Sequence, residues 1–177
     1  MFPDRFILNG ARVYVDTGAH PEYSTPETDN IRNIVTYDKA GERIFSSACA
    51  ELQRELENEG YVGSVKLFKN NSGMEIFNRE FARVEVSWGC HENYLTLRGI
   101  DFMRYAMHLI PFLVTRTIYT GAGGISHDAA GMHYEISDRA RFVKSNMTIS
   151  TIDKRGIINT KNETHANPDE YRRLHLI

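Results

Sequence analysis

The stretch NGARVYVDTGAHPEYSTPE, residues 9–27, holds the pattern that decides the fold of this chain. Val13 and Val15 alternate with polar side chains, which predicts a β-strand over residues 11–16 with one apolar face. The remainder of the stretch is rich in Pro, Thr and Ser. A polar, turn-rich loop is therefore expected to follow the strand.

The polar face of this predicted strand presents three chemically different side chains. Arg12, Tyr14 and Asp16 are spaced by two, so they point to one face. If the following turn brings Glu22 back beside them, the carboxylates supply oxygen ligands for Mg²⁺ and Arg12 neutralises phosphate. The same pattern also fits an exposed sheet face on which Arg and Asp pair in water. Spacing alone leaves both interpretations open.

The rest of the chain predicts two helices among several strands. Residues 37–59 repeat apolar or small side chains at helical spacing and end before Gly60. Residues 102–119 are strongly apolar, and Pro111 in their middle predicts a kink or a restart. Strands are predicted at residues 65–68, 81–86, 92–97, 132–137, 142–152 and 156–160. Strands in groups with helices apart from them predict an α+β fold, with helices on one face of a largely antiparallel sheet.

Three shorter features complete the predicted architecture. Two of the three strands predicted at residues 65–68, 81–86 and 92–97 are expected to pair as a hairpin. The four-glycine stretch TGAGGISHDAAG, residues 120–131, predicts a loop between the second helix and the later strands. Asn167–Glu170, with Pro168 near its first turn, predicts the start of a short helix.

Two other groups of polar residues are weaker candidates for a site. His91 and Glu92 adjoin a predicted strand and point to opposite faces, so at most one is expected to reach a shared site. Scattered cations further along the chain can reach phosphates, although solvated surface is the simpler interpretation for each one. This group consists of Arg139, Arg155, Lys161, Arg172, Arg173 and His175.

Composition argues against several classes of protein. The 177 residues are 41% hydrophobic, enough for one core and too few for two ordinary domains. A formal charge of -2, with acidic and basic residues interspersed, argues against a nucleic-acid partner. Cys49 and Cys90 stand far apart without a CxxC motif, which fits a reducing cytoplasm. Without a secretory signal or an apolar run of about 18 residues, we expect a cytoplasmic protein with no membrane partner.

Residues 9–27 are similar to the signature of the Pup ligase and Pup deamidase family, a branch of the glutamine-synthetase-like carboxylate-amine ligases. Further family motifs follow in order, so the resemblance covers essentially all 177 residues. These motifs read YDKAGER, LFKNN, GCHENYL, PFLVTR, TGAG, GIINT and HANPDEYRRLHLI. The resemblance implies a strongly curved antiparallel sheet that forms a cradle, with ATP at one end, Mg²⁺ between, and a groove for the disordered C-terminal part of Pup.

The resemblance also implies that residues 1–177 are the central part of a catalytic domain. The family's first strand, with paired carboxylates in a G-x-E-x-E pattern, is expected before Met1. A C-terminal part with an ATP-contacting tryptophan is expected after Ile177, and Trp88 does not match that position. The chain departs from the family where NTRDEPHAD is usual, and residues 73–86 are longer than the family pattern.

The family reaction implies a role for each residue of the polar face. ATP phosphorylates the γ-carboxylate of Pup's C-terminal glutamate, and a lysine of a target protein attacks the acyl phosphate to form an isopeptide bond. Asp16 matches the catalytic base that takes the lysine proton. Tyr14 and Glu22 match magnesium-binding positions. Arg12 and Thr25 match positions that contact ATP.

Two alternatives to a ligase stay open from the sequence. The Pup deamidase or depupylase acts on the same glutamate with the same fold. The spacing D-x-G-x-H-P-E-Y at Asp16–Tyr23 has the length of the ligase pattern, whereas residues 154–160 resemble the depupylase version. A non-catalytic fragment or pseudoenzyme that binds Pup is the second alternative, since the first magnesium carboxylates lie outside the chain. We expect the ligase.

Overall fold

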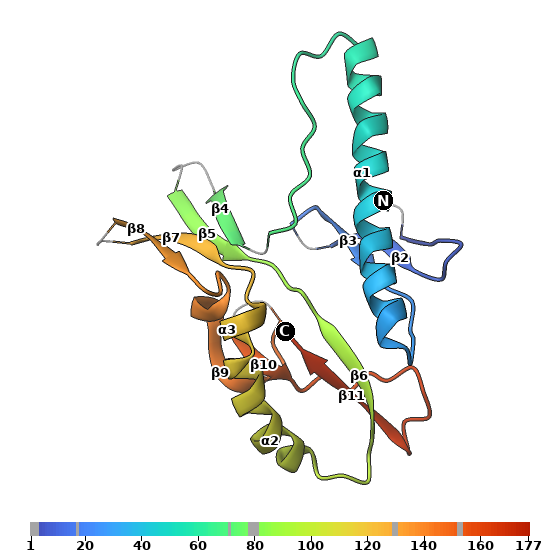
Figure 1. Cartoon of the computed structure of the whole chain (residues 1–177), viewed down its shortest axis with the longest axis vertical. Helices are drawn as coiled ribbons and strands as arrows, with labels where there is room; N and C mark the ends of the chain where they lie inside the picture. Colours follow the sequence, from blue (N-terminus) through green and yellow to red (C-terminus); the bar gives the residue numbers. More distant parts are fainter. Residues whose placement is uncertain (1–3, 17, 71, 78–81, 129–130, 152–153) are drawn as a thin grey trace. The chain divides into compact units, whose positions relative to one another are not determined.

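The computed structural model describes residues 4–16, 18–70, 72–77, 82–128, 131–151 and 154–177. The chain separates into two compact units, Met1–Lys69 and Asn70–Ile177. Each unit is described by itself in the following paragraphs, with the element labels of Figure 1. No helix among the described residues is both long enough and apolar enough to cross a membrane.

The first unit contains a three-stranded antiparallel sheet and one long helix. Its strands are β1 (Arg5–Phe6), β2 (Arg12–Asp16) and β3 (His20–Ser24), paired in that order. β2 confirms the predicted strand at residues 11–16. β3 lies where a loop was predicted, because Pro21 obscured the strand pattern. Proline is tolerated there since β3 has a ladder partner on only one side in the described sheet.

Helix α1 (Ile31–Asn58) begins earlier than the prediction of residues 37–59. Asn30 caps it, because its side-chain oxygen accepts a hydrogen bond from the backbone N–H of Arg32 at 2.9 Å. This cap allows the first turn to form before the apolar repeat becomes regular. The predicted end is confirmed, since Gly60 takes a φ of +84° just beyond the helix.

The segment after α1 is not the strand predicted at residues 65–68. It runs back along the helix in extended form, held by side chains of α1. The N–H of Val65 donates to Oε1 of Gln53 at 2.6 Å, and Nζ of Lys69 donates to Asp38 at 2.9 Å. Side chains of the helix therefore satisfy these donors, and the segment joins no sheet.

The second unit contains two hairpins, a four-stranded sheet and two helices (Figure 1). The hairpins pair β4 (Ser72–Phe77) with β5 (Ala82–Ser87), and β7 (Gly124–Asp128) with β8 (Gly131–Glu135). The sheet has the order β6 (Glu92–Leu97), β11 (Tyr171–Leu176), β10 (Arg155–Asn159), β9 (Val143–Thr148), and a 3-10 turn at Ala140–Phe142 precedes β9. All pairs are antiparallel except β9 with β10. A largely antiparallel α+β fold is thus confirmed.

The strand predictions succeed where alternation is strong and fail at glycine and proline. β6 matches residues 92–97, and β5, β8, β9 and β10 lie within a few residues of their predicted ranges; Phe81 lies outside the described residues. The expected hairpin is wrong, because β5 pairs with β4 and β6 pairs with β11. β7 occupies part of the predicted glycine loop. Asn167–Glu170 forms a turn, with Tyr171 N–H donating to the Asn167 carbonyl at 3.0 Å.

The predicted helix at residues 102–119 is divided, although not at its proline. Pro111 lies inside α2 (Phe102–Thr115), and the short α3 (Thr117–Thr120) follows. The hydroxyl of Thr115 donates to the carbonyl of Pro111 at 2.8 Å. The helix therefore restarts one turn beyond the proline.

The core of the second unit lies between α2 and the four-stranded sheet. Two side chains of α2 and three from β10 and β11 are its buried members: Ala106, Leu113, Ile158, Leu174 and Leu176. Because side chains alternate along a strand, Arg173 and His175, which neighbour Leu174 and Leu176 in β11, face the other side of the sheet. The sheet thus has an apolar face against α2 and a basic face opposite it.

Candidate active site

The polar face of the β2–β3 hairpin brings together four of the five predicted site residues. Directly opposite residues of an antiparallel ladder share a face. The cross-strand pairs on this face are Arg12 with Ser24, Tyr14 with Glu22, and Asp16 with His20. The fifth residue, Thr25, follows Ser24 directly and lies just past the end of β3.

Tyr14 and Glu22 form the centre of this face. The hydroxyl of Tyr14 donates a hydrogen bond to Oε1 of Glu22, and Oγ of Ser24 donates to the Tyr14 hydroxyl at 3.5 Å. Burial raises the pKa of Tyr14 to about 12, and the bond to Glu22 adds to that effect. The phenol therefore keeps its proton at neutral pH.

The surroundings of Glu22 disfavour the charged form of its carboxyl group. Burial raises its pKa, and the negative charge of Asp16 raises it further, while the hydrogen bond from Tyr14 partly offsets both effects. Asp16 lies diagonally across the ladder and is exposed. Two neighbouring carboxylates, one of them hydrogen-bonded by a phenol, are a set of oxygen donors that a divalent cation would stabilise.

Arg12 is paired, although not with Asp16. Its Nε and one terminal nitrogen donate to the two carboxylate oxygens of Asp4, at 2.7 Å and 2.5 Å. The guanidinium also stands 4.4 Å from the centroid of the Tyr14 ring. The interpretation of this face as an Arg–Asp pair in water is therefore right about Arg12 and wrong about its partner. The side chain of Asp16 is instead hydrogen-bonded with that of Glu22.

The oxygen donors of this face do not make a complete metal site within the described residues. No group of three or more His, Cys, Asp and Glu side chains in that part of the chain is close enough to hold a metal ion. Asp16, Glu22 and Tyr14 would supply part of a coordination shell. A complete site would need further ligands, and the paired carboxylates expected from a preceding strand stay a prediction.

A second cluster in the other unit was only partly anticipated. Nε2 of His175 lies 2.9 Å from Nδ1 of His91, with ring centroids 4.8 Å apart. Burial, followed by the charge of Arg173, lowers the pKa of His175 to about 4, and burial lowers the pKa of His91. Both rings are therefore neutral near pH 7. The sequence placed His175 with the scattered cations, and its contact with His91 was not predicted because the two residues are far apart in the chain.

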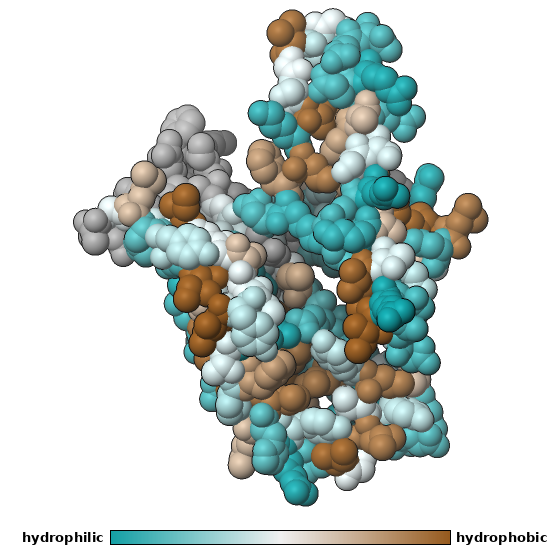
Figure 2. Space-filling model, in the orientation of Figure 1, coloured by the Kyte–Doolittle hydropathy of each residue, from teal (hydrophilic) through white to brown (hydrophobic). Residues whose placement is uncertain are grey.

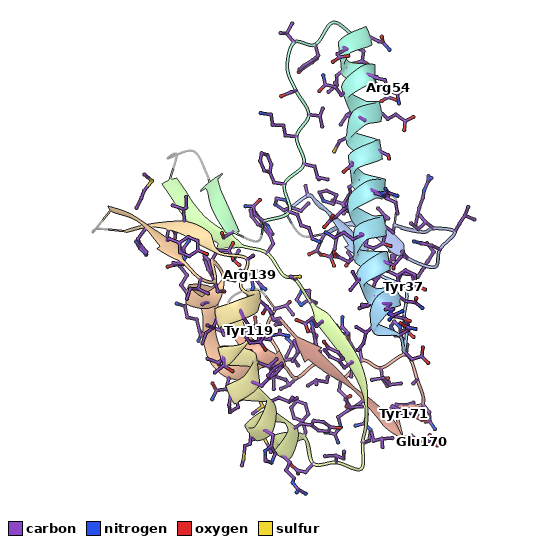
Figure 3. The ribbon with its side chains drawn as sticks, in the orientation of Figure 1. Tyr37, Arg54, Tyr119, Arg139, Glu170 and Tyr171 are labelled. Carbon is purple, nitrogen blue, oxygen red and sulfur yellow. The ribbon has the colours of Figure 1, made fainter. Side chains whose placement is uncertain are left out.

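Three of the scattered arginines gather around this histidine pair. The positive charges of Arg139, Arg173 and Arg155 all act on His91. Burial lowers the pKa of Arg155, and the charge of Arg139, which Figure 3 labels, lowers it further. Like charges held together in a partly buried place favour an anion that neutralises them. All three side chains are half-buried, so the interpretation of each as solvated surface holds only in part.

Glu92 takes no part in that cluster, as its position next to His91 predicted. Arg116 donates to both of its carboxylate oxygens, at 2.6 Å and 3.0 Å, and the hydroxyl of Tyr94 donates at 2.7 Å. Burial opposes ionisation of Glu92, but the hydrogen bonds from Arg116 and Tyr94 and the positive charge of Arg116 together outweigh it and lower the pKa. The pair fixes the start of β6 to the end of α2.

Two hollows lie in the second unit. The larger, of about 320 Å³, is lined by α2 and residues before it, including Arg104 and His108. The smaller, of about 180 Å³, is lined by Phe102, Thr160, Asn162, Arg172 and Arg173. The expected concavity at the β2–β3 hairpin stays a prediction.

Carboxylates beside a phenol on one antiparallel ladder, and arginines around a histidine pair in the other unit, define an α+β protein with two polar clusters. The family model for the Pup-ligase protein family matches residues 2–177. This chain belongs to that family.

Known members of the family are similar over nearly the whole chain. It is 45% identical over 172 residues to a Pup–protein ligase of a Nocardioides species and 46% identical to that of Sanguibacter keddieii. Each match covers 97% of this chain and 36% of the relative. The solved Pup ligase PafA in complex with ADP matches with a TM-score of 0.80 and 38% identity, covering 98% of this chain and 36% of that one. The PafA complex with Pup matches with a TM-score of 0.81 and 38% identity, covering 98% and 33%. The chain thus spans about a third of the length of these relatives.

Proposed function

We propose that residues 1–177 form the central part of the catalytic domain of a Pup ligase, which joins the C-terminal glutamate of Pup to lysines of target proteins with ATP. The main support for this proposal is the face that brings Tyr14, Glu22 and Asp16 together. The chain that carries this face is 45% identical to a Pup–protein ligase over 97% of its length. The relatives named above are ligases, which supports ligation over deamidation or depupylation. ADP and Pup bound to PafA support ATP and Pup as ligands.

Exposed apolar side chains support the place of this chain inside a larger domain. Met107, Ile118 and Tyr119 on α2 and α3 are each 68–71% exposed. Figure 2 shows apolar side chains at the surface over this part of the chain. Apolar faces of this kind usually pack against further structure. The proposed whole is a glutamine-synthetase-like cradle whose sheet continues with segments outside residues 1–177.

Magnesium fits the donors on the polar face. The negative charge of Asp16 raises the pKa of Glu22, and Arg12 is engaged by Asp4. Oxygen ligands of this hardness suit Mg²⁺. Tyr14 and Glu22 would hold the ion, which when bound would offset negative charge on a transferring phosphoryl group.

The first step proposed is activation of Pup. The γ-carboxylate oxygen of its C-terminal glutamate attacks the terminal phosphorus of ATP, the bond to ADP breaks, and an acyl phosphate forms. Arg12 and Thr25 would contact ATP. Arg12 can turn toward a phosphate at small cost, because its bond to Asp4 is exposed to solvent.

The second step needs a base. A lysine ammonium is not a nucleophile until it loses a proton, and exposed Asp16 can accept that proton through a carboxylate oxygen. The neutral amine then attacks the acyl carbon, phosphate leaves, and an isopeptide bond remains. Asp16 is exposed, so the lysine of a target protein can reach its carboxylate oxygens.

Incubating the full-length ligase with ATP, Mg²⁺, Pup ending in glutamate and a lysine-bearing acceptor tests the proposal. A new covalent adduct with release of ADP is expected. Cleavage of a preformed conjugate without ligation would replace the ligase with a depupylase. Pup binding without either reaction would indicate a non-catalytic module.

A further inference from the structure

The β2–β3 hairpin has a second, apolar face behind the polar one. Val13 lies directly across the ladder from Tyr23. Both alternate with Tyr14 and Glu22 along their strands, so they point to the opposite side of the sheet. A shift of Tyr23 on the apolar face therefore also shifts Glu22 and Ser24, its neighbours in β3, whose side chains lie on the polar face.

Gly41 is the place where helix α1 meets this apolar face. It is the buried residue of α1 among those described. A Cβ at position 41 would lie 2.6 Å from Cδ1 and 2.9 Å from Cε1 of the Tyr23 ring. Side chains do not approach that closely, so the contact requires glycine, although glycine is a poor residue in the middle of a helix.

The other end of the ring is also held. Nδ2 of Asn9 donates a hydrogen bond to the Tyr23 hydroxyl at 3.2 Å. The ring therefore lies between a helix backbone on one side and a side-chain partner at its tip. Tyr23 stands between Glu22 and Ser24, whose side chains both bond to the hydroxyl of Tyr14. A displaced ring moves β3 and changes the position of these groups.

We propose that Gly41 and Tyr23 form a positioning contact that fixes Glu22 against Tyr14 and thereby sets the affinity of the polar face for a divalent cation. Neither residue touches the cation; both act through β3. The inference rests on the metal assignment of the proposed function.

Binding of Mn²⁺ to the full-length ligase, followed by electron paramagnetic resonance, tests the inference without a reaction. Mn²⁺ takes the same oxygen ligands as Mg²⁺ and is paramagnetic. Gly41→Ala is expected to weaken Mn²⁺ binding about 10-fold or more, as changes behind a metal ligand do. Ser47→Ala, on an exposed position of α1, is the matched control and should bind as the wild type does.

A rescue variant separates positioning from general damage to the fold. In Tyr23→Leu the ring is absent, so β3 is held less firmly and a smaller loss of Mn²⁺ affinity is expected. The double variant with Gly41→Ala should bind as Tyr23→Leu does, because the added methyl group no longer meets a ring. Gly41→Ala favours the helix by propensity, so a purely local role predicts no loss of affinity.

Glu22→Gln distinguishes failure of this inference from failure of the metal assignment. Wild-type affinity in Gly41→Ala and in Tyr23→Leu, with weak binding in Glu22→Gln, overturns the positioning contact alone. Unchanged binding in Glu22→Gln overturns the metal assignment and the inference with it. If Gly41→Ala does not fold, the affinity of Tyr23→Leu decides, and a wild-type value overturns the proposal.

Discussion

The hydroxyl of Tyr14 donates a hydrogen bond to Glu22, the residue directly opposite it on the β2–β3 ladder. This bond joins a phenol that keeps its proton to a carboxylate whose pKa is raised by burial. It therefore sets both the place and the charge of the carboxylate that we assign to magnesium.

Glu22→Gln is expected to raise the Mg²⁺ concentration for half-maximal ligation by about 10-fold or more, because an amide is a weaker ligand than a carboxylate. Ligation rates across a Mg²⁺ titration measure this. Asp29→Asn, an exposed carboxylate beyond β3, is the control and should leave the titration unchanged. An unchanged midpoint in Glu22→Gln would remove this residue from the metal site.

Asp16→Asn is expected to lower the ligation rate about 10²–10⁴-fold while ATP affinity changes little. The amide has nearly the shape of the carboxylate but cannot accept the lysine proton. Single-turnover ligation and nucleotide titration measure the two effects, and thermal unfolding checks the fold. Near-normal ligation in this variant would leave Asp16 as a surface residue.

Tyr14→Phe is expected to make metal binding fail at a higher pH than in the wild type. The hydrogen bond from Tyr14 lowers the pKa of Glu22, against burial and Asp16, which raise it. Without that bond the carboxyl group takes up a proton at higher pH, and a protonated carboxyl group is a poor ligand. Mn²⁺ titrations from pH 7 downward give the midpoint; an unshifted midpoint contradicts the prediction.

Acid should destabilise the second unit through His175. Its folded pKa of about 4 lies below the ordinary 6.5, so between these values the unfolded chain binds a proton that the folded chain does not. Stability is therefore lost as pH falls from about 6.5 to about 4, by about 3 kcal/mol at most. Denaturant unfolding across this range measures it. His175→Gln should flatten the profile, and an equal slope in both proteins would contradict this assignment.

Arg139→Gln is expected to weaken binding of inorganic phosphate at the arginine cluster without lowering stability. Arg139 and Arg155 repel one another, and both act on His91, so removal of one charge relieves the fold. An anion held there would lose a charged donor, which costs about 1.5–3 kcal/mol. Phosphate titration and thermal unfolding measure the two quantities, with exposed Arg43→Gln on α1 as the control. Unchanged phosphate affinity would make the cluster a structural one.

The sequence predicted the elements whose side chains alternate or repeat without interruption. β2 and β6 were predicted because their patterns contain no proline or glycine, and the end of α1 was predicted because Gly60 follows it. β3 and β7 were not, since Pro21 and the glycines near residue 124 are typical of loops. The strand predicted at residues 65–68 was wrong because side chains of α1 satisfied its backbone donors instead.

Residue types and spacing by themselves determined that Arg12, Tyr14 and Asp16 share a face, since side chains alternate along any strand. Only the tertiary structure decided that Glu22 lies against Tyr14 and that His91 meets His175, 84 positions away. The position of a strand depends on packing against segments elsewhere in the chain, as the contact of the Tyr23 ring in β3 with Gly41 in α1 illustrates. The local sequence pattern determines to which face of a strand a side chain points. The packing of the whole unit determines which residue that side chain contacts.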